Sequence, residues 1–256
     1  MKDSRWVMTD YRTHEQQMSE WWASPLGQRL DQSERDALFS LKHLLYGYYQ
    51  VQIGGNSLLL PGSKRPEALL RAGEHADLAA QPENLPFKPH SIDSLMLMHV
   101  LEFSTDPHQL LREAERVLMD DGTLVLCCFN PLSLWGIKRL FSWQDRPPWN
   151  GHFFSRSRVQ DWLALLNFQI IDRRALGFTL PSQSVRLLRW TRFMQRWGAR
   201  LWPFFCGVTI VVASKRTIPL TPLPVRWRQA ALFPKTRLVN RPLTRHDRHT
   251  GTPEDG

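Results

Sequence analysis

The sequence predicts an α/β fold with a mostly parallel sheet, and residues 83–131 carry most of that prediction. Residues 92–98 form a short apolar run, typical of a strand that is buried on both faces. Asp106 and Pro107 are residue types that favour the N-cap and the first position of a helix. Residues 123–129 are a second apolar strand. Together these segments predict a βαβ unit, whose right-handed crossover brings both strand ends to one ligand-binding edge.

The helix expected after Pro107 has the pattern of a surface helix. Its charged residues fill one face, and its apolar residues recur at helical spacing on the other. The apolar set is Leu110, Leu111, Ala114, Val117 and Leu118. Asp121 and Gly122 then supply the turn chemistry that closes the unit.

The segments before this unit predict helices and the first strands. Residues 1–45 combine tryptophans with leucines at helical spacing, and we expect a helical segment that covers one edge of the sheet. Residues 48–53 predict the first strand. Residues 67–72 fit either a short helix or a strand, and residues 76–80 fit a third strand.

The segments after the unit predict two helices and the last two strands. Residues 132–141 favour a helix, and Ser155 is a candidate N-cap for another that runs to Leu166. Residues 168–171 and 207–213 are the apolar runs expected to form the remaining strands.

Six short signatures occur in order in this chain and resemble a known domain. They resemble the second half of a class I, S-adenosylmethionine-dependent methyltransferase of the small-molecule type 11 kind. The signatures are Leu85-Pro86-Phe87, Ile92-Asp93, Val100-Leu101-Glu102, Asp106-Pro107, Leu111-Arg112-Glu113, and Arg116-Val117-Leu118 with Asp121-Gly122. The resemblance is clear over about a third of the chain and extends weakly over residues 40–215. Phe129-Asn130-Pro131 and Ser133-Leu134-Trp135-Gly136 further resemble a bacterial subgroup whose glycine-rich motif is degenerate.

The resemblance implies a Rossmann-like class I methyltransferase fold. It implies a mostly parallel, seven-stranded sheet whose last two strands pair as an antiparallel edge, in a domain over residues 46–215. S-adenosylmethionine is the implied cofactor, and a small molecule is the implied methyl acceptor. Methyl transfer requires no covalent nucleophile, because the sulfonium is already activated and positioning supplies much of the rate.

The implied cofactor turn follows the first strand and departs from the family pattern. Gln52 replaces the family's acidic residue, keeping a carbonyl acceptor without the charge. Gly54 falls on the pattern and Gly55 follows it. Asn56 takes the second glycine position and tolerates a left-handed backbone, whereas Leu58 at the third does not do so easily. An ordinary strand-turn is the alternative interpretation.

Other cofactor and catalytic positions follow from the same resemblance. Gln81, followed by Pro82, stands where the family has an acid that faces adenine. The acid that binds the ribose hydroxyls is not placed; Glu67 and Glu74 are the nearby candidates, and either fits a solvated surface residue better.

The family lines its methyl-transfer site with residues equivalent to Met98, His99, Val100 and Leu101. His99 is a candidate general base or a satisfied structural group. Asn130 either orients a substrate or caps the next turn.

Charge is concentrated at the end of the chain. The net charge is +9, and residues 215–248 hold nine Lys or Arg against Asp247, which gives this segment +8. Prolines punctuate residues 216–256, so we expect a basic, disordered tail.

No apolar run reaches membrane-spanning length and the N-terminus lacks a secretion signal, which favours a cytoplasmic protein. The three cysteines and nine histidines show no disulfide or metal-ligand spacing.

Residues 184–202 predict a basic helix with an aromatic side. Its arginines fall at spacings of three and four, on one helical face: Arg186, Arg189, Arg192, Arg196 and Arg200. This pattern fits a solvated face over packed aromatic residues. Alternatively, the helix and the tail contact nucleic acid, an acidic partner or an anionic membrane surface. A catalytically inactive methyltransferase-like scaffold is therefore the second hypothesis for the function.

Overall fold

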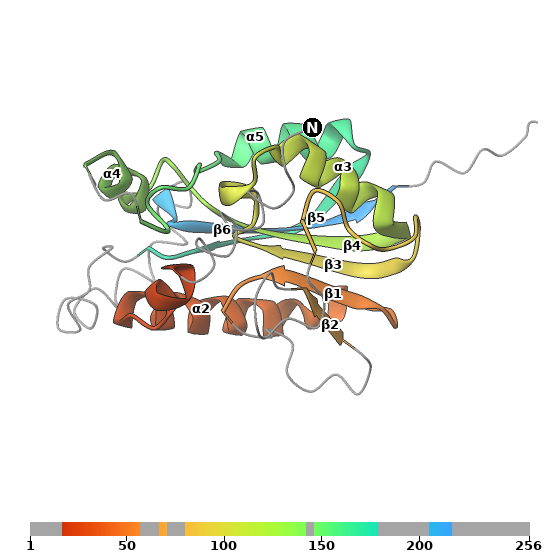
Figure 1. Cartoon of the computed structure of the whole chain (residues 1–256), viewed down its shortest axis with the longest axis horizontal. Helices are drawn as coiled ribbons and strands as arrows, with labels where there is room; N and C mark the ends of the chain where they lie inside the picture. The colour runs from red at the N-terminus through yellow and green to blue at the C-terminus, as the bar shows by residue number, and fades with distance from the viewer. Residues whose placement is uncertain (1–16, 57–66, 71–79, 142–145, 179–204, 217–256) are drawn as a thin grey trace, which may run out of the picture. The chain divides into compact units, whose positions relative to one another are not determined.

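The computed structural model describes residues 17–56, 67–70, 80–141, 146–178 and 205–216 (Figure 1). These residues form a six-stranded sheet with the strand order β2-β1-β3-β4-β6-β5. The strands are β1 (Gln50–Gly54), β2 (Glu67–Leu70), β3 (Ile92–Met98), β4 (Leu118–Phe129), β5 (Phe168–Leu176) and β6 (Val208–Lys215). The expected α/β fold is confirmed. Seven strands were expected, and residues 76–79 of the predicted third strand lie outside the described part.

The sheet is mixed in the way that the resemblance implies. Strands β2, β1, β3 and β4 are parallel neighbours, whereas β6 pairs antiparallel with both β4 and β5. Residues 67–70, for which the sequence left helix and strand open, are a strand. Strand β4 begins earlier than predicted: Leu118 already pairs with Ile92, and Asp121 at φ 61° lies in an irregularity inside the strand rather than in a loop before it.

Helices cover both faces of the sheet. They are α2 (Pro25–Leu41), α3 (Pro107–Val117), α4 (Leu134–Phe141) and α5 (Arg156–Leu165). In Figure 1, α2 lies on one side of the sheet, and α3 and α5 lie on the other. The predicted caps are confirmed: Asp106 accepts from the backbone nitrogen of Gln109, and Ser155 accepts from that of Arg158.

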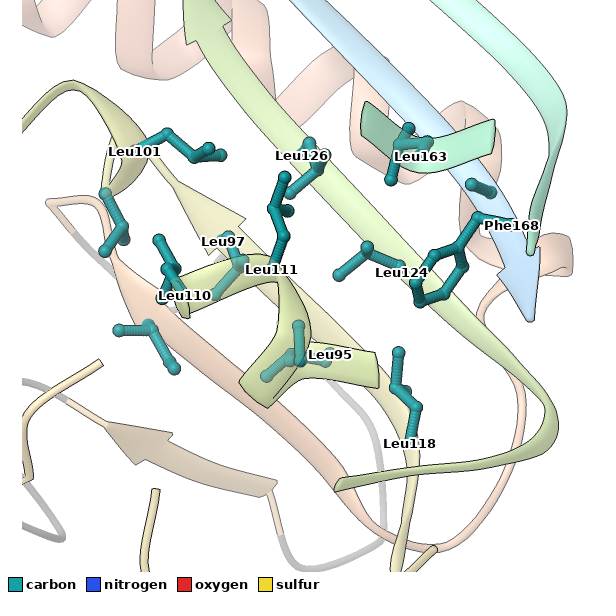
Figure 2. Close-up of a cluster of buried hydrophobic side chains, with 14 of the residues drawn as sticks. Leu95, Leu97, Leu101, Leu110, Leu111, Leu118, Leu124, Leu126, Leu163 and Phe168 are labelled. Carbon is teal, nitrogen blue, oxygen red and sulfur yellow. The ribbon is translucent and has the colours of Figure 1, made fainter. Parts of the chain in front are cut away.

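The core between the sheet and the α3–α5 layer is mainly aliphatic (Figure 2). Leu95 and Leu97 of β3 meet Leu110 and Leu111 of α3, and all four are fully buried. The helical spacing of α3 and the alternation along β3 therefore bury apolar side chains in one common core. Burial of this apolar surface is the main contribution that stabilises the folded state.

The core on the α2 face is rich in aromatic residues. Trp21 and Trp22 precede α2 and are 7% and 3% exposed. Trp135 stacks on Phe129 with ring centroids 5.7 Å apart, and Trp21 meets both rings edge-on. Trp21 and Trp22 therefore cover a face of the sheet, rather than the edge that the sequence suggested.

The signature Ile92-Asp93 fixes the approach to β1. Asp93 Oδ2 accepts hydrogen bonds from the backbone nitrogens of Tyr48 and Tyr49, at 2.9 and 2.8 Å. A carboxylate that accepts two backbone donors is a strong local anchor. The second residue of β3 thus holds the chain that enters its neighbour β1.

Candidate functional site

The carboxyl ends of three neighbouring parallel strands meet at one edge of the sheet. Gly54 of β1 is in register with Met98 of β3, and Met98 is in register with Cys127 of β4. The loops that follow β1, β3 and β4 therefore emerge side by side. Ligands of open α/β sheets bind outside this edge.

The turn after β1 has a backbone that glycine adopts most easily. Gly54 and Gly55 have φ angles of 73° and 81°, in the left-handed region. A Cβ on Gly54 would overlap the carbonyl oxygen of Met98, and one on Gly55 would lie 3.0 Å from the Gln52 amide nitrogen. The turn therefore packs closely against β3, and its bare backbone permits a close approach by a polar ligand.

Gln52 supports this turn from inside the protein. Its side chain is buried, and Nε2 donates to the carbonyl oxygen of Gly54 at 3.0 Å. Asn56 is exposed at the far side of the turn. The structure thus brings together Gln52, Gly54, Gly55 and Met98, while Leu58 lies outside the described residues.

Gln81 and Pro82 lie in a tight turn that is tied to the loop after β3. The backbone nitrogen of Asn84 donates to the carbonyl oxygen of Gln81 at 2.9 Å, and Pro82 is buried. Next to them, Glu83 accepts a 2.6 Å hydrogen bond from the hydroxyl of Ser104. This bond fixes the turn to the chain that leaves the binding edge through the 3₁₀ turn Leu101–Phe103.

His99 follows β3 with φ 54° and is held inside the protein. Its Nε2 lies 2.8 Å from Glu34 Oε1 and its Nδ1 lies 3.2 Å from Glu102 Oε1. Burial alone would lower the pKa of the imidazole, but Cys127 and Glu34 close by raise it more, so the pKa stands well above 6.5. Both ring nitrogens are engaged within the protein, and a catalytic role for His99 stays a prediction.

Cys127 completes a group that we call the buried polar cluster: Glu34, His99, Glu102 and Cys127. Its Sγ lies 3.5 Å from His99 Nε2 and 3.6 Å from Glu34 Oε1. Burial raises the pKa of the thiol to about 12, with a further contribution from Glu34. Glu102 Oε1 also accepts from the backbone nitrogen of Phe129 at 2.6 Å. The cluster therefore joins α2 to the ends of β3 and β4.

The sequence prediction did not include Glu34 or Cys127 among the site residues. Glu34 is 65 positions from His99, and Cys127 is 28 positions from it, so no local spacing connects them. One signal was present: Glu34 falls in the buried stripe of α2, between Leu30 and Leu38 at helical spacing. An acidic residue in an apolar stripe indicates a buried polar partner.

Asn130 connects the end of β4 to the chain just before β6 and to the turn just before α4. Its side-chain Nδ2 donates to the carbonyl oxygen of Cys206 at 3.0 Å, and its Oδ1 accepts from the backbone nitrogen of Leu132 at 3.1 Å. The second bond caps the turn, which is one of the two roles that the sequence left open. Its role toward a substrate stays a prediction.

Several predicted segments lie outside the described residues. They include Glu74, the basic helix with Arg186, Arg189, Arg192, Arg196 and Arg200, and the tail over residues 217–256. Within the described ranges, the helices are too short or too polar to cross a bilayer.

Comparison with known proteins gives matches at the levels of family, sequence and fold. Residues 62–126 match the type 11 family described as "Methyltransferase domain". The Escherichia coli K12 protein YafS, itself described as uncharacterized, is 34% identical over 187 residues, which are 71% of this chain and 74% of YafS. UbiE of Roseobacter denitrificans, a ubiquinone/menaquinone biosynthesis C-methyltransferase, is 30% identical over 126 residues, or 48% of this chain and 50% of UbiE.

Among solved structures, the fold is similar to that of an S-adenosylmethionine-dependent methyltransferase from Archaeoglobus fulgidus. The TM-score is 0.52 at 16% identity, over 72% of this chain and 94% of that one. This likeness supports the fold, and it agrees with the sequence matches.

Proposed function

The chain belongs to the type 11 family of class I S-adenosylmethionine-dependent methyltransferases, and from this premise we propose that it methylates a small molecule at the edge formed by β1, β3 and β4. The observation that carries the proposal is the turn at Gly54 and Gly55. Both glycines are left-handed, and the turn lies directly against Met98.

The residues at this edge suit the groups of the cofactor. When bound, S-adenosylmethionine supplies an activated methyl group on a sulfonium. Gly54 and Gly55 would bring backbone groups close to the methionyl part, with the Gln52 amide holding the turn in shape. Asn56 would lie at the exposed rim, and the Gln81-Pro82 turn is proposed to contact the adenine. Met98 would border the methyl-transfer site.

Calorimetric titration of the purified full chain with S-adenosylmethionine and with S-adenosylhomocysteine tests this proposal. We expect saturable binding with a Kd of roughly micromolar to submillimolar order. Asn56→Arg places a bulky cation at the rim of the turn, and because Asn56 is exposed the core remains intact. We expect this variant to weaken binding at least about tenfold, or about 1.4 kcal/mol.

Asp120→Arg is the matched control. Asp120 is exposed near the amino-terminal end of β4, at the opposite end of the sheet, and its 3.5 Å contact with His90 is a surface pair of small energetic value. This variant should bind like the unaltered protein. Absence of heat and of thermal stabilisation at roughly millimolar ligand would overturn the proposal, and would leave the inactive scaffold as the remaining hypothesis.

A further inference from the structure

Three side chains of the buried polar cluster direct different kinds of donor atoms at one another. Glu34 Oε1, His99 Nε2 and Cys127 Sγ lie within 4.8 Å of each other, and all three residues are buried. They come from α2, from the residue after β3, and from β4, so the tertiary fold alone brings them together.

The spacing of these atoms is close to that of ligands on one face of a tetrahedral zinc site. Zinc bonds of about 2.0–2.3 Å to nitrogen, oxygen and sulfur place ligand atoms about 3.3–3.6 Å apart at tetrahedral angles. The sulfur is 3.5 Å from the nitrogen and 3.6 Å from the oxygen, which matches two sides of that triangle. The third side, from nitrogen to oxygen, is 2.8 Å and would open by about half an ångström.

Glu102 stands behind His99 as the partner of its other ring nitrogen. Histidines that bind zinc usually donate their second N–H to a carboxylate, which fixes the ring and raises its basicity. Glu102 Oε1 lies 3.2 Å from His99 Nδ1, leaving Nε2 to face Glu34 and Cys127. The ring is further held against Phe129, with centroids 4.2 Å apart.

The charges of the cluster also favour a cation. Two carboxylates, Glu34 and Glu102, are 1% and 0% exposed, and a single imidazole lies between them. Among the described residues, Glu102 Oε2 has no hydrogen-bond partner. Buried carboxylates are costly unless they are paired or coordinate a metal.

We propose that Glu34, His99 and Cys127 bind a zinc ion, which fastens α2 to the ends of β3 and β4. Mixed oxygen, nitrogen and sulfur donors suit this borderline-soft ion. Binding breaks the Sγ–H bond of Cys127 and the Nε2–H bond of His99, forms the zinc–sulfur and zinc–nitrogen bonds, and releases both protons to water. No electron is transferred.

Cobalt(II) is the probe, because its bond to a thiolate produces a charge-transfer absorption in the near ultraviolet and because zinc displaces it. Full-length protein is freed of metal with a chelator and titrated first with Co²⁺ and then with Zn²⁺. We expect the band to saturate at about one Co²⁺ per chain and to disappear on addition of Zn²⁺.

The chain offers a matched pair of variants. Cys127 and Cys128 are both buried and adjacent on β4, but they belong to cores on opposite faces of the sheet. Cys127 Sγ is the sulfur that lies 3.6 Å from Glu34 Oε1 and 3.5 Å from His99 Nε2. We expect Cys127→Ala to lose the band and Cys128→Ala to keep it. Glu102→Gln should keep the band while weakening affinity about 10–100-fold.

Each outcome decides the proposal. Failure of the unaltered protein to give the band, or a band that persists in Cys127→Ala, overturns it. If Cys127→Ala does not fold, the Tm of the unaltered protein is decisive: it should rise with Zn²⁺ and stay unchanged with Mg²⁺ at the same concentration. None of these measurements involves S-adenosylmethionine, so failure here is distinguishable from failure of the proposed function.

Discussion

Glu113 and Arg116, which lie one turn apart on α3, form a 2.7 Å ion pair that clamps the Leu85-Pro86-Phe87 signature. Glu113 Oε1 accepts from the backbone nitrogen of Leu85 at 2.8 Å. Arg116 Nη2 donates to the carbonyl oxygens of Leu85 and Phe87, at 3.1 and 3.0 Å. Signatures that are far apart in the sequence thus form one hydrogen-bonded unit.

Arg116→Ala is expected to destabilise the protein by about 2 kcal/mol, because two backbone carbonyls lose their donor and Glu113 loses its cation. Urea unfolding measures the change. Arg112→Ala is the control on the same helix: Arg112 is exposed and contacts Gln109 on the surface, so its loss should cost less than about 0.5 kcal/mol. Equal losses for the two variants would contradict the clamp.

The same pair predicts a pH dependence of stability. The hydrogen bond from Arg116 lowers the pKa of Glu113 from 4.5, and the Leu85 backbone lowers it further. A group whose pKa is lower in the folded state contributes stability above its unfolded value, and this contribution is lost as the pH falls through the folded value. The contribution should therefore be complete above about pH 4.5 and decline below it.

Two variants test this pH dependence. Glu113→Gln should reduce the decline of the free energy of unfolding at acidic pH, and Arg116→Gln should do the same. An unaltered decline in Arg116→Gln would show that another group is responsible.

The Ser133-Leu134-Trp135-Gly136 motif ends in glycine because the backbone of Pro131 leaves no room for a side chain at this position. A Cβ at this position would overlap the carbonyl oxygen of Pro131, and Ser133 Oγ accepts from the Gly136 nitrogen at 3.2 Å while donating to the Asn130 carbonyl at 2.6 Å. Gly136→Ala should cost about 1–3 kcal/mol through overpacking. Thermal unfolding would show this as a lower Tm. Leu132→Ala, at a side chain 64% exposed, should leave the Tm nearly unchanged.

Gln52→Glu restores the acid of the family pattern. We expect this variant to lower the free energy of unfolding of the ligand-free protein. The buried carboxylate cannot donate to the carbonyl of Gly54, and the loss of this donor costs about 1–3 kcal/mol. Burying the charge of the carboxylate adds to this cost. The loss should be smaller at a pH that protonates the carboxylate. Unfolding curves at neutral and acidic pH check this, and a loss that is independent of pH would contradict it. Gln52→Met is the uncharged control that also removes the donor.

The βαβ unit around α3 and the start of α5 were predictable because their signals are local. Asp106 and Ser155 cap helices through hydrogen bonds to residues three positions ahead, and the apolar spacing of α3 matches the core that it enters. The antiparallel pairing of β5 and β6 came from the resemblance and not from any local pattern.

Local sequence patterns contain a signal for Glu34, in the apolar stripe of α2, but none for the association of the four residues of the buried polar cluster. Its members lie on separate elements of the fold. Glu34, which contacts His99, is 65 positions away from it in the sequence, so no local spacing connects the two residues. The Asp121-Gly122 turn chemistry suggested a loop, although β4 continues through it, because pairing with β3 resumes after a register shift.

Two adjacent residues of β4, Cys127 and Cys128, lie in the two different cores on opposite faces of the sheet. Cys127 belongs to the aromatic core beneath α2, while Cys128 belongs to the aliphatic core beneath α3 and α5. A thiol reagent under native conditions can reach each sulfur only when the layer over it opens. Adjacent cysteines in this chain are thus built-in reporters, and the order in which they are modified reveals which layer detaches first.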